Sequence, residues 1–266
     1  MTLAGTLPYR RMNFLERIGL VFIHLFEETG LWFRMLLRTI LWTFRPPFEG
    51  IEWLRQMVRV GVDSVPVVFL TTMFTGMVMA LQTYNGFHRV HAENFVGSVV
   101  ALAMLRELSP VLVALMVTGR VGSSMAAEIG TMRVTEQLDA LEALATDPVQ
   151  YLFVPRVIAG IVMLPLLTIL GDALGVGGGY LVAVKLMGAN PVVYETNTYQ
   201  FLEMNDVWSG LIKAAVFGLI LTLTGCVRGY HTKGGAEGVG RATTAAVVSA
   251  SLIILFADFF LTKLLF

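Results

Sequence analysis

The sequence has few charges and almost no cysteine, and each shortage excludes a class of protein. Only 14% of its 266 residues are Asp, Glu, Lys or Arg, whereas soluble domains carry roughly a quarter. Hydrophobic residues make up 56% of the chain and its mean hydropathy is +0.72, which predicts burial in lipid. The lone cysteine, Cys226, excludes an internal disulfide framework. A formal net charge of zero gives no reason to expect nucleic acid as a partner.

Motifs for nucleotide, metal or covalent chemistry are also missing. The chain contains no GxxxxGK[ST] loop, so it is not expected to bind ATP itself. Gly171, Gly175 and Gly179 recur every four residues inside an apolar run, a spacing that lets two membrane helices approach closely. The four histidines form no ligand cluster, and no nucleophile stands beside a base and its orienting group. We therefore expect no metal, no cofactor and no catalytic residues in this chain.

Long apolar runs predict an all-α integral membrane protein with five transmembrane helices. A crossing helix needs about 20 mostly apolar residues. Five windows meet this need, at 65–84, 95–118, 158–187, 207–227 and 245–265. The sequence thus divides into an N-terminal region at 1–62 and a permease-like membrane domain at 63–266, and we see no internal repeat or second soluble domain.

The N-terminal segment at 14–44 differs from these windows. It is rich in apolar residues but is interrupted by Glu16, Arg17, Glu27, Glu28 and Arg34. This pattern is typical of an amphipathic helix lying in the membrane interface. Pro46 and Pro47 end it, and a short amphipathic stretch at 51–60 leads into the first span. No small-residue cleavage site follows the apolar residues, so we do not expect a signal peptide.

The distribution of arginine and lysine predicts the orientation. With the N-terminus in the cytoplasm, most basic residues fall on the cytoplasmic side, including those before the first span and those between spans two and three and spans four and five. The other side then holds the acidic residues of the longest external loop. The positive-inside rule therefore places the N-terminus in the cytoplasm and the C-terminus outside.

The loop between spans two and three has the richest pattern. Apolar residues at 134, 138, 141 and 145 recur at helical spacing and predict a short amphipathic helix from Val134. Asp147 and Pro148 predict the N-terminus of the next helix. Such a helix is either a simple connector or a knob that inserts into a partner protein.

The segment EIGTMRVTEQL at 128–138, with Asp147–Pro148 after it, resembles the signature of the MlaE family of ABC transporter permeases. Three further segments support the resemblance: GMVMALQ at 76–82, LRELSP at 105–110 and GRATTA at 240–245. These four separated motifs occur in the order found in the family. The resemblance covers the chain from about residue 60 to its end.

The resemblance implies a homodimeric inner-membrane permease with an interfacial helix, five spans and a cytoplasmic coupling helix. It implies transport of phospholipids between the inner and outer membranes, which maintains outer-membrane lipid asymmetry. Expected partners are a separate ABC ATPase, which uses the ATP, and an MCE-domain protein on the periplasmic side, and a small cytoplasmic accessory subunit is left open. The residues expected to couple to the ATPase are Glu128, Ile129, Met132, Arg133, Thr135, Glu136 and Leu138.

One face of the first span suits acyl chains. Helical spacing brings together Phe74, Met77, Val78, Leu81 and Tyr84, and methionine adapts to varied apolar shapes. This face either lines a lipid path or packs against a neighbouring helix, and the family resemblance favours the lipid path.

Charged residues inside the spans are expected to have a specific role, because each costs roughly 2.5–3.5 kcal/mol at the membrane centre. Arg106 and Glu107 in span two and Lys213 in span four could meet a lipid headgroup. Alternatively, Glu107 could pair with Lys213, or Asp258 with Arg106, and hold the bundle together. We favour the structural role for Asp258 and leave both roles open for the other three.

Two other functions compete with the ABC permease hypothesis. A self-contained secondary transporter would couple transport to ions through Arg106, Glu107 and Asp258. A membrane scaffold would transport nothing and would tolerate loss of these charges. Only the permease hypothesis requires a stoichiometric ATPase partner.

Overall fold

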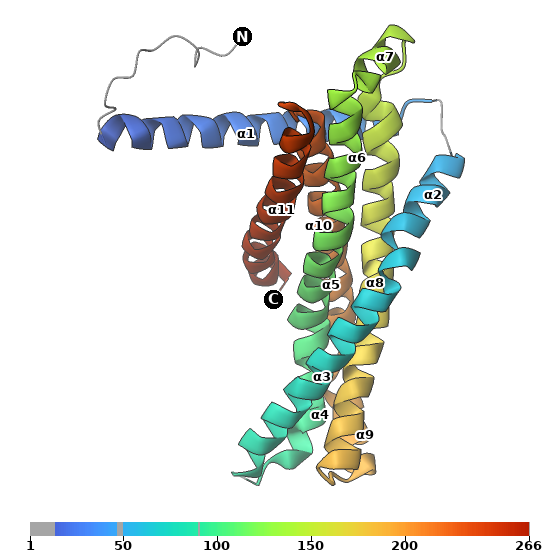
Figure 1. Cartoon of the computed structure of the whole chain (residues 1–266). Helices are drawn as coiled ribbons and strands as arrows, with labels where there is room; N and C mark the ends of the chain where they lie inside the picture. Colours follow the sequence, from blue (N-terminus) through green and yellow to red (C-terminus); the bar gives the residue numbers. More distant parts are fainter. Residues whose placement is uncertain (1–13, 47–49, 90, 266) are drawn as a thin grey trace.

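The computed structural model describes the backbone of residues 14–46, 50–89 and 91–265, and their side chains except those of 14–22, 24 and 25. Within these residues every regular element is helical (Figure 1). Five helical rods are long and apolar enough to cross a membrane: Gly50–His88, Glu93–Val134, Val149–Leu186, Met204–Tyr230 and Gly235–Leu265. They match the five predicted windows in order and confirm an all-α membrane protein.

Several rods are built from more than one helix. The first contains α2 (Gly50–Val60) and α3 (Val65–His88), which the turn Val62–Ser64 separates. The division of the chain into 1–62 and 63–266 stays a prediction. The second contains α4 (Val96–Ala103), α5 (Ser109–Val117) and α6 (Ser123–Val134), joined by π-helical turns at Met104–Leu108 and Thr118–Gly122. The third is α8 (Val154–Tyr180) with π-helical turns at Val149–Phe153 and Leu181–Leu186.

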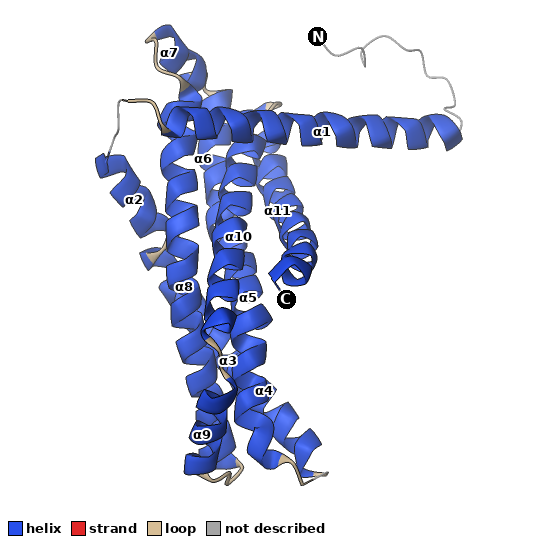
Figure 2. Ribbon diagram, turned by 180° about the vertical axis from the view of Figure 1, so that it is seen from behind, coloured by secondary structure: helices blue, strands red, loops and turns tan. Residues whose placement is uncertain are grey.

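The remaining helices are α1 (Phe14–Thr43), α7 (Gln137–Ala143), α9 (Pro191–Phe201), α10 (Met204–Tyr230) and α11 (Gly235–Leu265). Figures 1 and 2 show α1 lying crosswise at the end of the bundle where α7 projects, with α9 at the opposite end. This placement agrees with an interfacial α1. The central rod is α10, which contacts α5, α6, α8 and α11.

Glycines let α8 approach α3 as their spacing predicts. A Cβ on Gly76 of α3 would overlap the backbone carbonyl of Gly175 on α8. A Cβ on Gly171 would lie 3.0 Å from Thr72 of α3. The two backbones therefore touch directly, and the four-residue glycine repeat is a packing surface.

Two expectations about the connections were wrong. The external segment treated as a loop contains α9, whose start is set by Asn190: its side chain accepts hydrogen bonds from the amides of Val192 and Val193, and Pro191 fits the first helical position. The helix expected from Val134 begins instead at Gln137, because Val134 still belongs to α6 and Glu136 has a left-handed backbone. The predicted N-cap at Asp147 is confirmed, since its Oδ1 accepts from the Val149 amide at 2.8 Å.

Candidate functional site

The segment predicted to couple to an ATPase forms a fixed projection at the α1 end of the bundle. Its stalk, α6, continues span two without a loop, and its tip is α7. Two non-glycine residues with positive φ bracket the tip: Glu136 at 58° and Ala145 at 60°. A left-handed backbone costs such residues roughly 1–2 kcal/mol each, so the surrounding contacts must hold α7 in this position.

Those contacts come from three other helices. Leu138 of α7 is fully buried in the main hydrophobic core. Arg133 forms an ion pair with Asp139 at 2.7 Å, and its guanidinium lies 5.9 Å from the ring centre of Tyr230 on α10. After α7, Asp147 forms an ion pair with Arg38 of α1 at 2.6 Å. The tip is thus braced to α6, α10 and α1.

The predicted coupling residues separate into an inner and an outer group. Ile129 and Leu138 are buried, and Met132 packs against the same core. Thr135 and Glu136 are exposed at the tip. Direct contact with a partner in this conformation is available to the outer group, while the inner group positions the tip. Sequence reasoning missed Leu144, an apolar residue that is 76% exposed just after α7.

Glu128 has a different environment from its neighbours in the motif. Its carboxylate lies 3.0 Å from Arg59 of α2 and 3.0 Å from Arg156 of α8. Arg156 is almost fully buried, so the pair with Glu128 compensates a charge inside the protein. Glu128 therefore ties the stalk of the projection to two neighbouring helices.

The predicted lipid face of α3 is only partly open. Phe74, Val78 and Leu81 are 59%, 57% and 40% exposed. Met77 and Tyr84 are half-buried and pack against the second hydrophobic cluster, which contains Val100 and Met104. The three outward residues leave an apolar strip on α3, and contact of this strip with transported lipid stays a prediction.

Four of the charged residues predicted inside the spans form two polar groups, one around Lys213 and one around Arg106. Lys213, on α10 and fully buried, lies 2.7 Å from Glu107 Oε2 and 3.2 Å from Asp258 Oδ1 of α11. Its Nζ also donates to Thr262 Oγ1 at 2.7 Å. We call Lys213, Glu107, Asp258 and Thr262 the lysine cluster.

Backbone chemistry accounts for a further contact of the lysine cluster. Pro110 lacks an amide hydrogen and cannot donate to the carbonyl of Arg106 one turn earlier. Lys213 Nζ donates to that oxygen at 3.0 Å. A lysine has three hydrogens to donate, and the carbonyl, Glu107 and Thr262 receive them. The predicted headgroup contact of Lys213 stays a prediction, and in this conformation its hydrogens are engaged within the bundle.

Arg106 does not pair with Asp258, as one alternative suggested. Its side chain reaches Asp206 at the start of α10, with Nη2 2.6 Å from Oδ1. Asp206 Oδ2 accepts from the amide of Glu203 at 2.9 Å in a capping box. Asp258 instead pairs with Lys213, in agreement with the structural role favoured for it. A π-helical turn, often found at functional sites, carries both Arg106 and Glu107.

The family model for the MlaE permease matches residues 53–264, which include the projection, the α3 strip and the lysine cluster. The chain belongs to the MlaE permease family. A member of this family is a transport subunit and not an enzyme. The permease match begins in α2 and ends in α11, so it covers all five spans.

Individual relatives of this MlaE-family permease come from bacteria and a plant. A probable ABC transporter permease protein of Rickettsia typhi is 48% identical, covering 96% of this chain and 98% of the relative. The intermembrane phospholipid transport system permease protein MlaE of Haemophilus influenzae is 37% identical over the same shares, 96% and 98%. The chloroplastic protein TRIGALACTOSYLDIACYLGLYCEROL 1 of Arabidopsis thaliana is 41% identical, over 81% of this chain and 63% of the relative.

Proposed function

We propose that this permease moves phospholipids between the inner and outer bacterial membranes, as the membrane subunit of an ABC transporter whose ATPase is a separate chain. Membership of the MlaE permease family supports a transport role. The name of the Haemophilus relative, which covers nearly the whole chain, supports phospholipid as the substrate. The permease lies in the inner membrane with α1 and α7 on the cytoplasmic side, an orientation supported by the distribution of arginine and lysine.

The observation that carries the ATPase assignment is the braced projection of α7. An element that transmits force from a cytoplasmic motor must be stiff, and α7 is connected by buried and ionic contacts to α6, α10 and α1. Its outer surface presents Thr135, Glu136 and Leu144 to a partner. An exposed leucine and an acidic residue at the two ends of α7 suit a groove with an apolar floor and a basic rim.

The lipid path is proposed along the apolar strip of α3. Phe74, Val78 and Leu81 are too exposed to be a finished interior, and a second copy of the chain facing this strip would enclose a central cavity. The permease is therefore proposed to work as a homodimer, which would also present two projections to two ATPases. An MCE-domain protein on the periplasmic side would receive or deliver the lipid.

The experiment that tests the ATPase assignment is co-purification of the permease with its ATPase from native membranes. Glu136→Lys and Leu144→Asp should each reduce the retained ATPase by at least about tenfold, since charge reversal or burial of a new charge at an interface costs several kcal/mol. Glu195→Lys on α9, at the opposite end of the bundle, is the matched control and should retain it. Normal retention and ATP hydrolysis in both tip variants would refute docking at α7.

The lipid path is tested separately with photoreactive residues at Val78 on α3 and at Leu255 on α11, which are 57% and 50% exposed. Crosslinking of labelled phospholipid at Val78 should depend on the ATPase and ATP, whereas Leu255 should label equally with and without ATP. ATP-independent labelling at both positions would indicate bulk lipid and overturn the path. Transport that persists without any ATPase would instead support an ion-coupled secondary transporter.

A further inference from the structure

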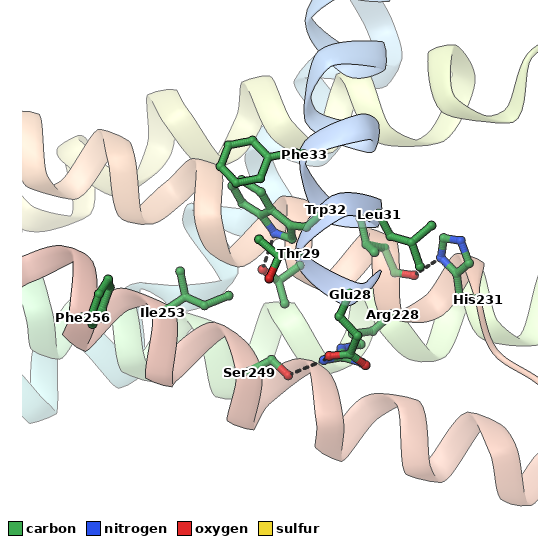
Figure 3. A pocket seen from close by; sticks show the side chains of 12 residues that line it. Glu28, Thr29, Leu31, Trp32, Phe33, Arg228, His231, Ser249, Ile253 and Phe256 are labelled. Carbon is green, nitrogen blue, oxygen red and sulfur yellow. Dashed lines mark hydrogen bonds and ion pairs between the residues drawn. The ribbon is translucent and has the colours of Figure 1, made fainter. Parts of the chain in front are cut away.

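A cavity of about 460 Å³ lies where α1 crosses α10 and α11, away from both the α3 strip and α7. Its volume is within the range of roughly 300–1,000 Å³ typical of small-molecule sites. Figure 3 shows its lining side chains, which come from all three helices. Nothing in the proposed transport path uses this cavity.

The polar part of the cavity is a pair of opposite charges. Arg228 of α10 donates two hydrogen bonds to Glu28 of α1, Nη1 to Oε1 at 2.6 Å and Nη2 to Oε2 at 2.8 Å. Nη2 also donates to Ser249 of α11 at 2.9 Å. The pair remains accessible, since the side chains of Arg228 and Glu28 are 30% and 45% exposed. This end of the cavity therefore presents a cationic and an anionic side chain whose charges offset each other.

His231 adds a second acceptor to the polar end. Its Nδ1 lies 2.9 Å from the carbonyl oxygen of Val227. Because a carbonyl only accepts hydrogen bonds, Nδ1 carries the hydrogen, and in the neutral ring Nε2 is then an acceptor. His231 lines the cavity together with Glu28, so two acceptors and one guanidinium lie around the same space.

The rest of the lining is mostly apolar, apart from Thr29 and Thr224, and it extends along α11 away from the charged pair. Ile253 and Phe256 follow Ser249 along α11 at one-turn intervals (Figure 3). Trp32 and Phe33 of α1 form the wall above them, and Trp32 is fixed by a hydrogen bond from Nε1 to Thr224 Oγ1 at 3.1 Å. A ligand that fills the cavity thus meets charged groups at one end and apolar side chains at the other.

We infer that this cavity binds one zwitterionic aminophospholipid from the leaflet in which α1 lies, with its phosphate at Arg228 and its ammonium group at Glu28 and His231. An anionic lipid would bring an uncompensated negative charge to a pair that is already neutral, and a free phosphate would leave the apolar wall empty. A primary ammonium supplies three donors for the two acceptors, which a quaternary choline group lacks. The bound lipid would fasten α1 to the bundle, a role separate from transport.

Lipid retention on the purified full-length permease tests the site. The protein is reconstituted in nanodiscs that contain phosphatidylcholine with equal parts of phosphatidylethanolamine and phosphatidylglycerol, then returned to mild detergent, and the lipids that remain bound are identified by native mass spectrometry. Wild type should retain phosphatidylethanolamine preferentially. Ile253→Trp fills the apolar wall and should lower that retention at least about tenfold, equivalent to about 1.4 kcal/mol. Leu252→Trp, one residue away and outside the lining, should retain it normally.

A second variant, Glu28→Gln, tests whether the charged pair selects the lipid headgroup. It also provides a test of the site if Ile253→Trp folds poorly. Glu28→Gln removes the anionic acceptor and leaves Arg228 positively charged, so retention should change from phosphatidylethanolamine toward phosphatidylglycerol. Equal retention of all three lipids by wild type, or unchanged retention in both Ile253→Trp and Glu28→Gln, would overturn the inference. Either result leaves the proposed transport function standing, because neither residue lies on the α3 strip or on α7.

Discussion

Removing the charge of Lys213 should destabilise the permease severely. Lys213→Met keeps most of the side-chain volume but leaves Glu107 and Asp258 facing each other without their cation. Breaking a buried ion pair by removing one partner costs roughly 3–5 kcal/mol. The Arg106 carbonyl also loses the donor that Pro110 cannot replace. Because the Glu107 side chain is 38% exposed, we expect a loss in the lower part of that range.

The free energy of unfolding is measured by SDS titration of the purified permease in dodecyl maltoside micelles, with helicity followed by circular dichroism. Lys263→Met, which changes an exposed lysine on α11, is the matched control and should stay within about 0.5 kcal/mol of wild type. Adding Glu107→Gln and Asp258→Asn to Lys213→Met should recover part of the loss, because no unpaired charge then remains. A Lys213→Met protein as stable as wild type would refute the view that this cluster holds the second span, α10 and α11 together.

Two further pairs of variants test packing and backbone strain with the same assay. Gly76→Ala should destabilise the permease by more than about 1–3 kcal/mol, the usual cost of overpacking, because its methyl group meets the backbone of α8. The control, Gly86→Ala on the same helix, has nothing within 4 Å and should be neutral or slightly stabilising. Equal effects of the two substitutions would contradict the close approach of α3 and α8. Ala145→Gly should stabilise the protein by up to about 1 kcal/mol, because glycine adopts the positive φ of this position without strain. The control, Ala143→Gly inside α7, should destabilise it by roughly 0.5–1 kcal/mol. A lower free energy of unfolding in both variants would show that residue 145 is not strained.

The sequence was sufficient for the spans because membrane burial leaves a strong and local signal. A run of about 20 mostly apolar residues is the length that crosses a bilayer and is rare in soluble chains, and all five windows correspond to helical rods in the structure. The N-cap at Asp147 and the packing role of the glycine repeat could also be predicted, since each depends on neighbours one turn away. The family could be recognised from the motif at 128–138, which the match over 53–264 confirms.

Partners across helices could not be predicted from the sequence. The pairing of Glu107 with Lys213 was one of two open alternatives. Arg106 pairs with Asp206, which lies just before the predicted window at 207–227. Helical spacing gives the direction of a side chain from its own axis but not which helix lies there. The same limit applies to the α3 face, which divides into outward and half-buried residues, and to the cavity beneath α1, which had no sequence signal.

The position of the lysine cluster has a consequence for how the chain enters the membrane during synthesis. Lys213 lies on α10 and Asp258 on α11, which are consecutive spans, and Glu107 is already in the bilayer when they emerge. A lone lysine at the membrane centre costs roughly 2.5–3.5 kcal/mol on insertion. Insertion of α10 by itself is therefore less favourable than that of a span without a charge. Because α10 enters beside the second span and α11 follows at once, the Lys213 ammonium can pair with Glu107 and Asp258 soon after it leaves water. Its exposure to lipid without a partner is therefore short. Helices four and five are therefore best understood as one hairpin for the insertion machinery, assembled against a bundle that already contains the matching charge.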